Sequence, residues 1–145
     1  MSHRSFEDVI VGEAIDCGTV SVTRSEIIAF AERHDPLGIH TDPEAAADSP
    51  FDGVIASGIH TLALTQPPVV EHFYGDSDLV AAGRIESLRF PAPVRPGDAL
   101  SVELSVLEKR AASGADDRGV VRTRRTASVG EEPVLEMRND TVWRR

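Results

Sequence analysis

The stretch PFDGVIASGIHTLALTQPPVVEHFY, residues 50–74, is the least polar long segment of the chain. Its middle, residues 55–64, has apolar side chains on most sides of a helix, which predicts a buried helix. Pro67 and Pro68 are expected to break or kink this helix, because each lacks an N–H group and clashes with the preceding turn. A further short helix to about Tyr74 is expected. A helix this apolar needs a surface to pack against.

Four segments of the second half are rich in Val, Leu, Arg and Thr and are separated by turn signals: residues 79–90, 98–109, 118–129 and 133–143. From Leu100 to Val106 apolar and polar residues alternate strictly, as in a strand with one buried face. An earlier strand around residues 18–23 is expected to join the same sheet. Because helices come first and hairpin-connected strands follow, the sequence predicts an α+β fold with a largely antiparallel sheet, covered by the apolar helix.

The third of these strand segments carries a run of arginines. Alternation places Val121, Thr123, Arg125 and Ala127 on one face of the strand. The opposite face carries Arg122, Arg124, Thr126 and Ser128. Because a run of charge is most simply a solvated surface, the arginines at positions 122, 124 and 125 are interpreted as part of a solvated strand face.

Two helix starts precede the apolar segment. Thr23, followed three residues later by Glu26, forms a capping-box pattern, and apolar residues recur behind it at helical spacing. Pro36 disfavours helix at the preceding residue, so this first helix should end near His34. Asp42, followed directly by a proline, is the second N-cap pattern and predicts a short second helix.

Length and composition indicate one globular domain, residues 1–145. Of the 145 residues, 41% are hydrophobic and 27% are charged, close to the average of globular proteins. Cys17 is the single cysteine, which excludes an internal disulfide and suits a reducing compartment. The N-terminal segment carries acidic side chains where a signal peptide would be apolar. We therefore expect a cytoplasmic protein.

The charge balance argues against two classes of partner. Fifteen Lys and Arg residues against 24 Asp and Glu residues give a net charge of −9. We expect no nucleic acid partner, because nucleic-acid binders present a basic surface. We also expect no membrane partner, because the chain gains little from anionic lipid and no apolar run approaches the roughly 20 residues of a spanning helix.

The densest cluster of reactive side chains is the segment HDPLGIHTD, residues 34–42. Pro36 and Gly38 predict a loop, and functional residues concentrate in loops. The carboxylate of Asp35 and the imidazole of His40 can converge on one small molecule as a general acid–base pair, because imidazole titrates near neutral pH. The alternative is a polar loop in which Asp35 caps or turns the chain and His40 lies on the surface.

The predicted apolar helix begins with the small residues Ala56, Ser57 and Gly58. A helix N-terminus offers free N–H groups and a partial positive charge, which suit a developing oxyanion. Gly58 would let a substrate approach the backbone closely, so Ser57 and Gly58 are candidate substrate-binding residues. The alternative is structural, with Ser57 as an N-cap and Gly58 allowing tight packing.

The remaining patterns favour neither a cofactor nor a metal. The histidines are scattered, and the sequence has neither HExxH nor a carboxylate-rich ligand spacing. It also lacks the glycine-rich nucleotide fingerprints GxGxxG and GxxxxGK(S/T), and the GxSxG nucleophile elbow. We therefore expect a protein that works without a bound cofactor and without a catalytic metal.

Taken together, the two clusters resemble the MaoC-like family of (R)-specific enoyl-CoA hydratases and acyl dehydratases. The resemblance rests on a series of motifs: Phe30-Ala31-x3-Asp35-x4-His40-x-Asp42, then Ala45-Ala46, then Phe51-x-Gly53-x-Ile55-Ala56-x-Gly58, and the later turn Val94-Arg95-Pro96-Gly97-Asp98. It implies a hot-dog fold, in which a curved antiparallel sheet of about five strands wraps around a central helix. It also implies reversible syn-hydration of a trans-2-enoyl-CoA to an (R)-3-hydroxyacyl-CoA.

The resemblance further implies roles for single residues. Asp35 and His40 match the pair that activates one water molecule, and Gly58 matches the glycine whose N–H binds the thioester oxygen. The chain departs from the family pattern at Leu37-Gly38, where Asn-Pro is common, and at Ser57, where a histidine is common. These departures bear on substrate identity and efficiency more than on the class of reaction.

Two other functions stay open at this point. One is a thioesterase, which usually has a carboxylate on the central helix, where residues 56–66 offer none. The other is a non-catalytic acyl-thioester-binding or structural protein, because fold alone does not determine function.

The expected partners are an acyl-CoA, or an acyl-carrier-protein thioester, and a second copy of the chain. A homodimer is expected because the open edges of a five-stranded sheet favour pairing. CoA is polyanionic, so a chain of negative net charge needs a local basic patch to bind it. The candidates for that patch are Arg84, Arg89, Arg95 and Arg110.

Overall fold

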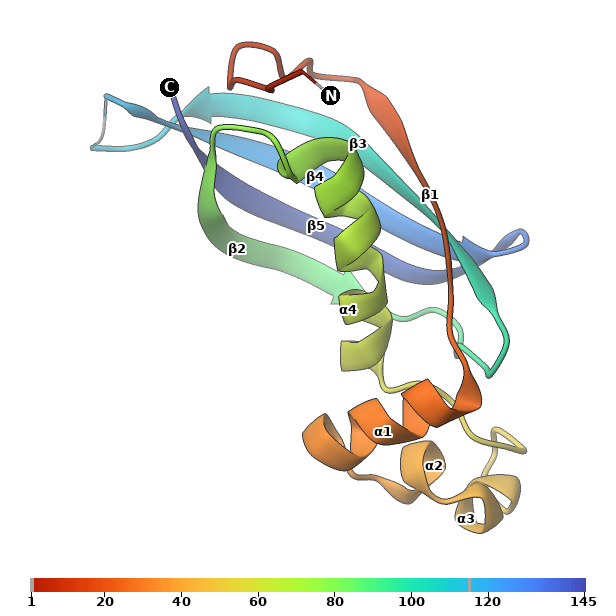
Figure 1. The fold of residues 1–145 in the computed structure, drawn as a ribbon. Helices are drawn as coiled ribbons and strands as arrows, with labels where there is room; N and C mark the ends of the chain where they lie inside the picture. Colours follow the sequence, from red (N-terminus) through yellow and green to blue (C-terminus); the bar gives the residue numbers. More distant parts are fainter. Residues whose placement is uncertain (1, 115) are drawn as a thin grey trace.

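The computed structural model describes residues 2–114 and 116–145, which form a curved sheet wrapped around one helix (Figure 1). Within these residues the sheet has five strands in the order β1-β3-β4-β5-β2, and every neighbouring pair is antiparallel. The strands are β1 (Ala14–Ser21), β2 (Leu79–Arg89), β3 (Ala99–Ala111), β4 (Arg118–Val129) and β5 (Glu132–Arg144). This is the hot-dog fold that the resemblance implies.

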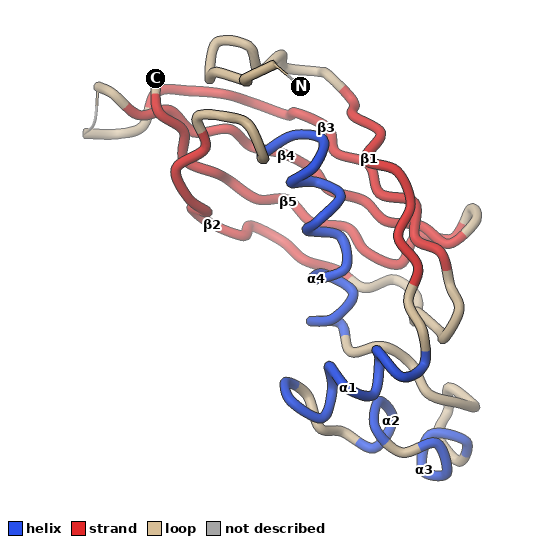
Figure 2. The backbone as a smooth tube through the Cα atoms, in the orientation of Figure 1, coloured by secondary structure: helices blue, strands red, loops and turns tan. Residues whose placement is uncertain are grey.

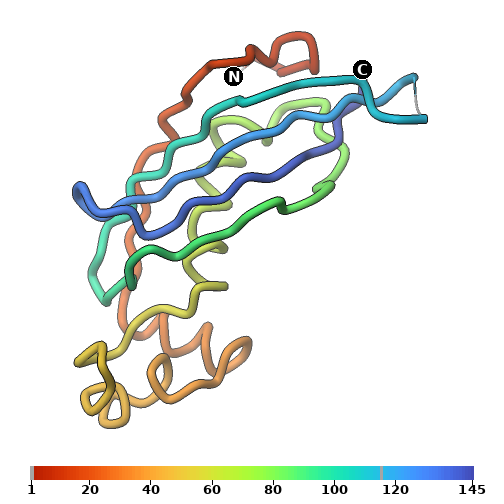
Figure 3. The backbone as a smooth tube through the Cα atoms, turned by 180° about the vertical axis from the view of Figure 1, so that it is seen from behind, coloured from red at the N-terminus to blue at the C-terminus, as the bar shows by residue number. Residues whose placement is uncertain are grey.

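The central helix α4 (Gly58–Val69) lies across one face of the sheet (Figure 2), and the view from behind shows the strands covering it (Figure 3). The strands turn apolar side chains toward this helix. In β3, Leu100, Val102, Leu104 and Val106 are buried, while the residues between them are more exposed. Removing such side chains from water is the dominant favourable term in folding, so α4 and the inner face of the sheet form the core.

All five predicted strands are present. The early strand, however, spans Ala14–Ser21 rather than residues 18–23, because Thr23 already caps the next helix. The pairing of β1 with β3 shifts register between Asp16 and Thr19, where Gly18 has a positive φ of 82°. A glycine adopts this conformation without steric cost, so β1 bends there and stays paired on both sides of the irregularity.

Of the expected break or kink at Pro67 and Pro68, the break is wrong, whereas the expected further short helical segment to about Tyr74 is confirmed. Both prolines lie inside α4, and a single π-helical turn, η1 (Val70–Tyr74), follows directly. The backbone N–H of Val70 donates to the carbonyls of Gln66 and Pro67, so the hydrogen-bond ladder resumes immediately after the prolines. The carbonyls that lose a donor are those of Ala63 and Leu64, four residues before each proline, while the wider turn closes with the Gly75 N–H donating to the Val70 carbonyl at 2.7 Å.

The helix starts predicted near the N-terminus are confirmed. In α1 (Arg24–His34), the Thr23 hydroxyl accepts from the Glu26 N–H while the Glu26 carboxylate accepts from the Thr23 N–H. Asp42 caps α3 (Pro43–Ala47). The segment between them is not the continuous loop that was expected, because residues 38–41 form the short helix α2 (Gly38–Thr41). These helices gather at the end of the molecule where α4 begins (Figure 1).

The interpretation of the three arginines on β4 is only partly correct. Arg124 is exposed on the outer face of the sheet and Arg122 is partly exposed there. Arg125 is only 2% exposed and faces α4, so its assignment to a solvated face is wrong. The alternation along the strand placed Arg125 correctly with Val121, and the charge of its side chain led to the wrong expectation about solvent.

Candidate active site

The candidate residues meet where α4 begins. Asp35 is the C-cap of α1, His40 belongs to α2, and Ser57 is the N-cap of α4. The N–H of Ile55 donates to the carbonyl of Ile39 at 3.1 Å, which ties the segment before α4 to α2. Two segments that are far apart in the sequence are thereby held side by side.

His40 is oriented by the backbone. It is 6% exposed, and its Nδ1 lies 2.8 Å from the carbonyl oxygen of Ile55. Because a carbonyl oxygen only accepts, Nδ1 carries the hydrogen in this contact and the neutral ring keeps its lone pair on Nε2. Nε2 lies 3.5 Å from Oδ2 of Asp35. His40 is therefore not the surface residue of the structural alternative.

Asp35 receives a short hydrogen bond from the start of α4. The Ser57 hydroxyl donates to Oδ2 of Asp35 at 2.6 Å, across 22 positions of sequence. Ser57 is completely buried, and its side chain makes no capping bond to the described residues of α4. The interpretation of Ser57 as a side-chain N-cap is therefore wrong, because its hydroxyl is committed to Asp35.

Gly58 is the first residue of α4, so its N–H has no acceptor within the helix. The aromatic ring of Phe90 packs against its Cα. A Cβ at position 58 would lie 2.8 Å from Cε2 of Phe90. Phe90 follows β2 directly and is 44% exposed. Sequence reasoning missed this residue, because a single aromatic after a strand carries no signal of what it covers.

A cavity of about 310 Å³ opens beside the start of α4. Its lining is mainly apolar and consists of His40, Phe51, Ile55, Ala56, Gly58, Thr61, Phe90, Pro91, Ala92, Pro93 and Val94. The imidazole and the first residue of the helix thus border one apolar space. A small apolar group in that space would have a basic nitrogen on one side and a free backbone donor on the other.

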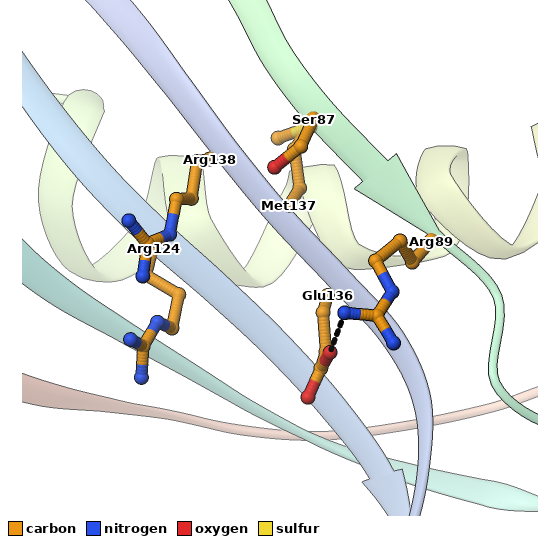
Figure 4. Close-up of a pocket in the computed structure, with 6 residues that line it drawn as sticks. All are labelled: Ser87, Arg89, Arg124, Glu136, Met137 and Arg138. Atoms are coloured by element: carbon orange, nitrogen blue, oxygen red, sulfur yellow. Dashed lines mark ion pairs between the residues drawn. The ribbon is translucent and has the colours of Figure 1, made fainter.

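Of the four predicted arginines only one lies beside the cavity, while Arg84 and Arg110 lie near Asp140, where their charges help to lower the pKa of its carboxyl. Arg95 is close to the cavity, because its guanidinium donates to the carbonyl of Phe51 at 2.7 Å. Arg89 instead pairs with Glu136 at 3.9 Å on the outer face of the sheet. There it borders a hollow with Ser87, Arg124, Glu136, Met137 and Arg138 (Figure 4). Arg110 pairs with Glu108 near the far end of β3.

Among residues 2–114 and 116–145 no group of three or more His, Cys, Asp or Glu side chains is arranged to hold a metal ion. Burial raises the pKa of the Cys17 thiol, which keeps the sulfur protonated and unreactive. No described helix is long and apolar enough to cross a membrane.

Comparison with known proteins gives consistent matches. Residues 8–129 match the family described as MaoC like domain. The protein YdeM of Bacillus subtilis, itself uncharacterized, is 35% identical over 106 residues, or 72% of this chain and 74% of YdeM. A 3-hydroxybutyryl-CoA dehydratase of Methylorubrum extorquens is 32% identical over 132 residues, or 90% of this chain and 78% of that enzyme.

A solved structure agrees with the sequence matches. The MaoC-like dehydratase from Rhodospirillum rubrum superimposes with a TM-score of 0.82 at 34% sequence identity, and the match covers 97% of both chains. The match therefore extends over the sheet, the central helix and the helices that carry Asp35 and His40.

Proposed function

Because this chain belongs to the MaoC-like dehydratase domain family, we propose that it is an acyl-CoA hydratase/dehydratase that interconverts a trans-2-enoyl-CoA and an (R)-3-hydroxyacyl-CoA. One observation carries the proposal. His40 and Gly58 line one apolar cavity at the start of α4, Asp35 Oδ2 lies 3.5 Å from His40 Nε2, and the Gly58 N–H has no acceptor within the helix. A relative at 32% identity is named a 3-hydroxybutyryl-CoA dehydratase, which removes water in the reverse of this hydration.

The proposed role of His40 and Asp35 is to hold one water molecule. Nε2 of His40 and Oδ2 of Asp35 are 3.5 Å apart, which is close enough for one bound water molecule to reach both. The Ile55 carbonyl holds the hydrogen on Nδ1, which leaves Nε2 as the acceptor for a proton from that water. The Ser57 hydroxyl fixes the carboxylate of Asp35 in the position that orients the water.

The addition itself follows from these positions. As an O–H bond of the water breaks, its proton goes to Nε2 and its oxygen bonds to C3 of the enoyl group. The electron pair of the double bond moves toward the thioester oxygen, where the Gly58 N–H and the positive end of the α4 dipole stabilise the charge. C2 then takes its proton from the same Asp35–His40 pair. The water oxygen reaches C3 and the proton reaches C2 from the same face of the double bond, which gives syn addition.

The experiment is a direct assay with crotonyl-CoA. Loss of enoyl absorbance and release of free thiol are followed in parallel, with chiral analysis of the product. We expect loss of absorbance without thiol release, and an (R)-3-hydroxy product. Thiol release would identify a thioesterase instead. Binding of acyl-CoA with neither signal would identify a non-catalytic acyl-thioester-binding protein, and either result would overturn the proposal.

We further propose that the chain forms a homodimer through the β2 edge of the sheet. Nine of the 11 residues of β2 are exposed, including Val80 and Ile85, which are 47% and 53% exposed. In the described part of the chain β2 pairs with β5 on one side and has no partner on the other. An open apolar edge of this kind favours pairing with a second chain. Light scattering that shows a stable monomer at micromolar concentration would contradict this proposal.

A further inference from the structure

A second cavity lies farther along α4, between the helix and the inner face of the sheet. Its volume is about 180 Å³. It is lined by Leu62, Gln66, Tyr74, Leu79, Ala82, Ile85, Arg125, Met137, Asn139 and Thr141. The cavity at the catalytic end includes Thr61 of the same helix and Phe90, which follows β2. Both cavities therefore border the seam between α4 and β2.

Arg125 brings a positive charge into this second cavity. It is 2% exposed, and its Nη1 donates to Oγ1 of Thr65 at 3.0 Å and to Oε1 of Gln66 at 2.9 Å. Among the described residues no carboxylate lies within 4.0 Å of its guanidinium, and its Nε has no acceptor. Burial lowers the pKa of Arg125, yet an arginine stays charged in proteins.

The neighbours of Arg125 do not neutralise it. The Cys17 thiol is protonated, because burial raises its pKa. Tyr74 is 6% exposed; its hydroxyl lies near Arg125, where it acts to raise the pKa of the guanidinium, and its O–H has no acceptor among the described residues. Removing a cation from water without a counter-charge is costly, and buried donors in folded proteins are normally satisfied. Arg125 and Tyr74 thus offer unused donors inside an otherwise largely apolar cavity.

We propose that Arg125 and Tyr74 form a subsite for a carboxylate at the far end of the acyl group. The substrates favoured by the enzyme would then be 2-enoyl thioesters that end in a carboxylate. This inference rests on the proposed hydratase function, which places the thioester at Gly58. The apolar walls, including Leu62 and Ile85, suit the methylene chain between the two ends.

The length of α4 sets the length of that chain. Gln66 lies eight residues after Gly58, which corresponds to roughly 12 Å along the helix axis at the rise of an α-helix. An acyl group that reaches Arg125 from the thioester site must span this distance, so we expect a medium-length chain. A short dicarboxylic chain would leave the carboxylate in the apolar part of the seam.

The decisive experiment compares two substrates of equal length, one 2-enoyl-CoA ending in a carboxylate and one ending in a methyl group. In the wild type, kcat/KM should be higher for the carboxylate. Arg125→Met should lower kcat/KM for the carboxylate-terminated enoyl-CoA roughly 10- to 100-fold, because a charge-assisted hydrogen bond is lost. The value for the methyl-terminated enoyl-CoA should not change. Arg124→Met, on the outer face of the same strand, is the matched control and should change neither value.

Two results would overturn the subsite: no preference for the carboxylate-terminated substrate in the wild type, or an equal loss of kcat/KM for both substrates in Arg125→Met. Hydration of the methyl-terminated substrate distinguishes this failure from failure of the proposed function. If the protein hydrates neither substrate, the affinities of the two corresponding saturated acyl-CoAs are measured by calorimetry instead. A carboxylate preference that Arg125→Met abolishes then supports the subsite while the hydratase function fails, and no preference overturns both.

Tyr74→Phe keeps the test decisive if Arg125→Met does not fold. This variant retains the buried ring and removes only the hydroxyl. A several-fold loss of kcat/KM that is confined to the carboxylate-terminated enoyl-CoA supports the subsite. An unchanged ratio of the kcat/KM values for the two substrates contradicts it.

Discussion

Two clusters of polar side chains beside α4 differ in their hydrogen bonding. At the start of α4, Asp35, His40 and Ser57 are each held by another group of the protein, so the position of each reactive atom is fixed. Toward its other end, Arg125 and Tyr74 keep donors that nothing in the described chain accepts. The first cluster therefore has fixed geometry, while the donors left in the second cluster are the ones that the proposed carboxylate would bind.

The largest expected effect tests the partnered cluster at the start of α4. His40→Ala and Asp35→Asn should each lower kcat by about 10²–10⁴, the usual range for acid–base groups. The double variant should be little worse than either single one, because groups that act as a unit are non-additive. His34→Ala, at an exposed position of α1, is the control and should keep full activity. Asp35→Asn with wild-type kcat would refute the mechanism.

These variants also differ in stability. The loop that the sequence predicts around Asp35 and His40 implies little effect of either substitution on folding. Because His40 is buried and bonded to the Ile55 carbonyl, we instead expect His40→Ala to cost about 1–3 kcal/mol. Asp35→Asn keeps an oxygen that accepts from Ser57, so its unfolding free energy should change little. Urea unfolding of both variants separates the catalytic effect from the structural one.

The next effect concerns the start of α4 and its cover. Gly58→Ala places a Cβ 2.8 Å from the Phe90 ring, and this overpacking should cost about 1–3 kcal/mol of stability. Phe90→Ala in the same chain should recover most of that loss, because the ring is what the new methyl group meets. Thermal unfolding of the single and double variants measures both the loss of stability and its recovery. If the double variant is no more stable than Gly58→Ala, a backbone change is responsible rather than the ring.

Ser57→Ala should have a smaller effect, confined to catalysis. Loss of the 2.6 Å hydrogen bond leaves Asp35 free to turn, and kcat should fall by about 10-fold. Because Ser57 makes no side-chain cap in the described structure, the loss of stability typical of a removed cap is not expected. A comparison of kcat with the unfolding midpoint decides the point, and a large drop in stability at unchanged kcat would assign Ser57 to the scaffold.

The smallest expected effect concerns the pH dependence of stability and contrasts Arg122 with Arg125, both on β4. Arg122 donates to Asp140 at 2.9 Å, and this hydrogen bond lowers the pKa of the Asp140 carboxyl. A carboxyl with a lowered folded-state pKa adds stability above its unfolded pKa of about 4, and this stability is lost as the pH falls through the folded value. Asp140→Asn should therefore flatten the acid side of the stability profile.

The measurement is urea unfolding at a series of pH values from neutral to acid. Arg122→Met should remove the same acid dependence, because it removes the partner that lowers the pKa. Arg125→Met should leave this dependence intact, since Asp140 pairs with Arg122 rather than with Arg125. A steep acid limb that persists in Asp140→Asn would assign the pH dependence to other carboxyl groups.

Local patterns in the sequence predicted most of the elements. The alternation from Leu100 to Val106, the capping box at Thr23 and the N-cap at Asp42 depend on neighbouring residues, and all three are present in the structure. The family motif likewise pointed to Asp35, His40 and Gly58, and the small residues of the helix start pointed to Ser57; the fold brings all four together at the start of α4. Their proposed chemical roles await the variants above.

Only the tertiary structure decided the contacts between distant segments and the solvent exposure of each side chain. The bond from Ser57 to Asp35 and the ring of Phe90 against Gly58 join parts of the chain that no local period relates. Arg125 shows the same limit: strand alternation gave its face, but the sequence of β4 does not record that α4 covers that face. Burial depends on which element packs opposite, and that is a property of the assembled fold.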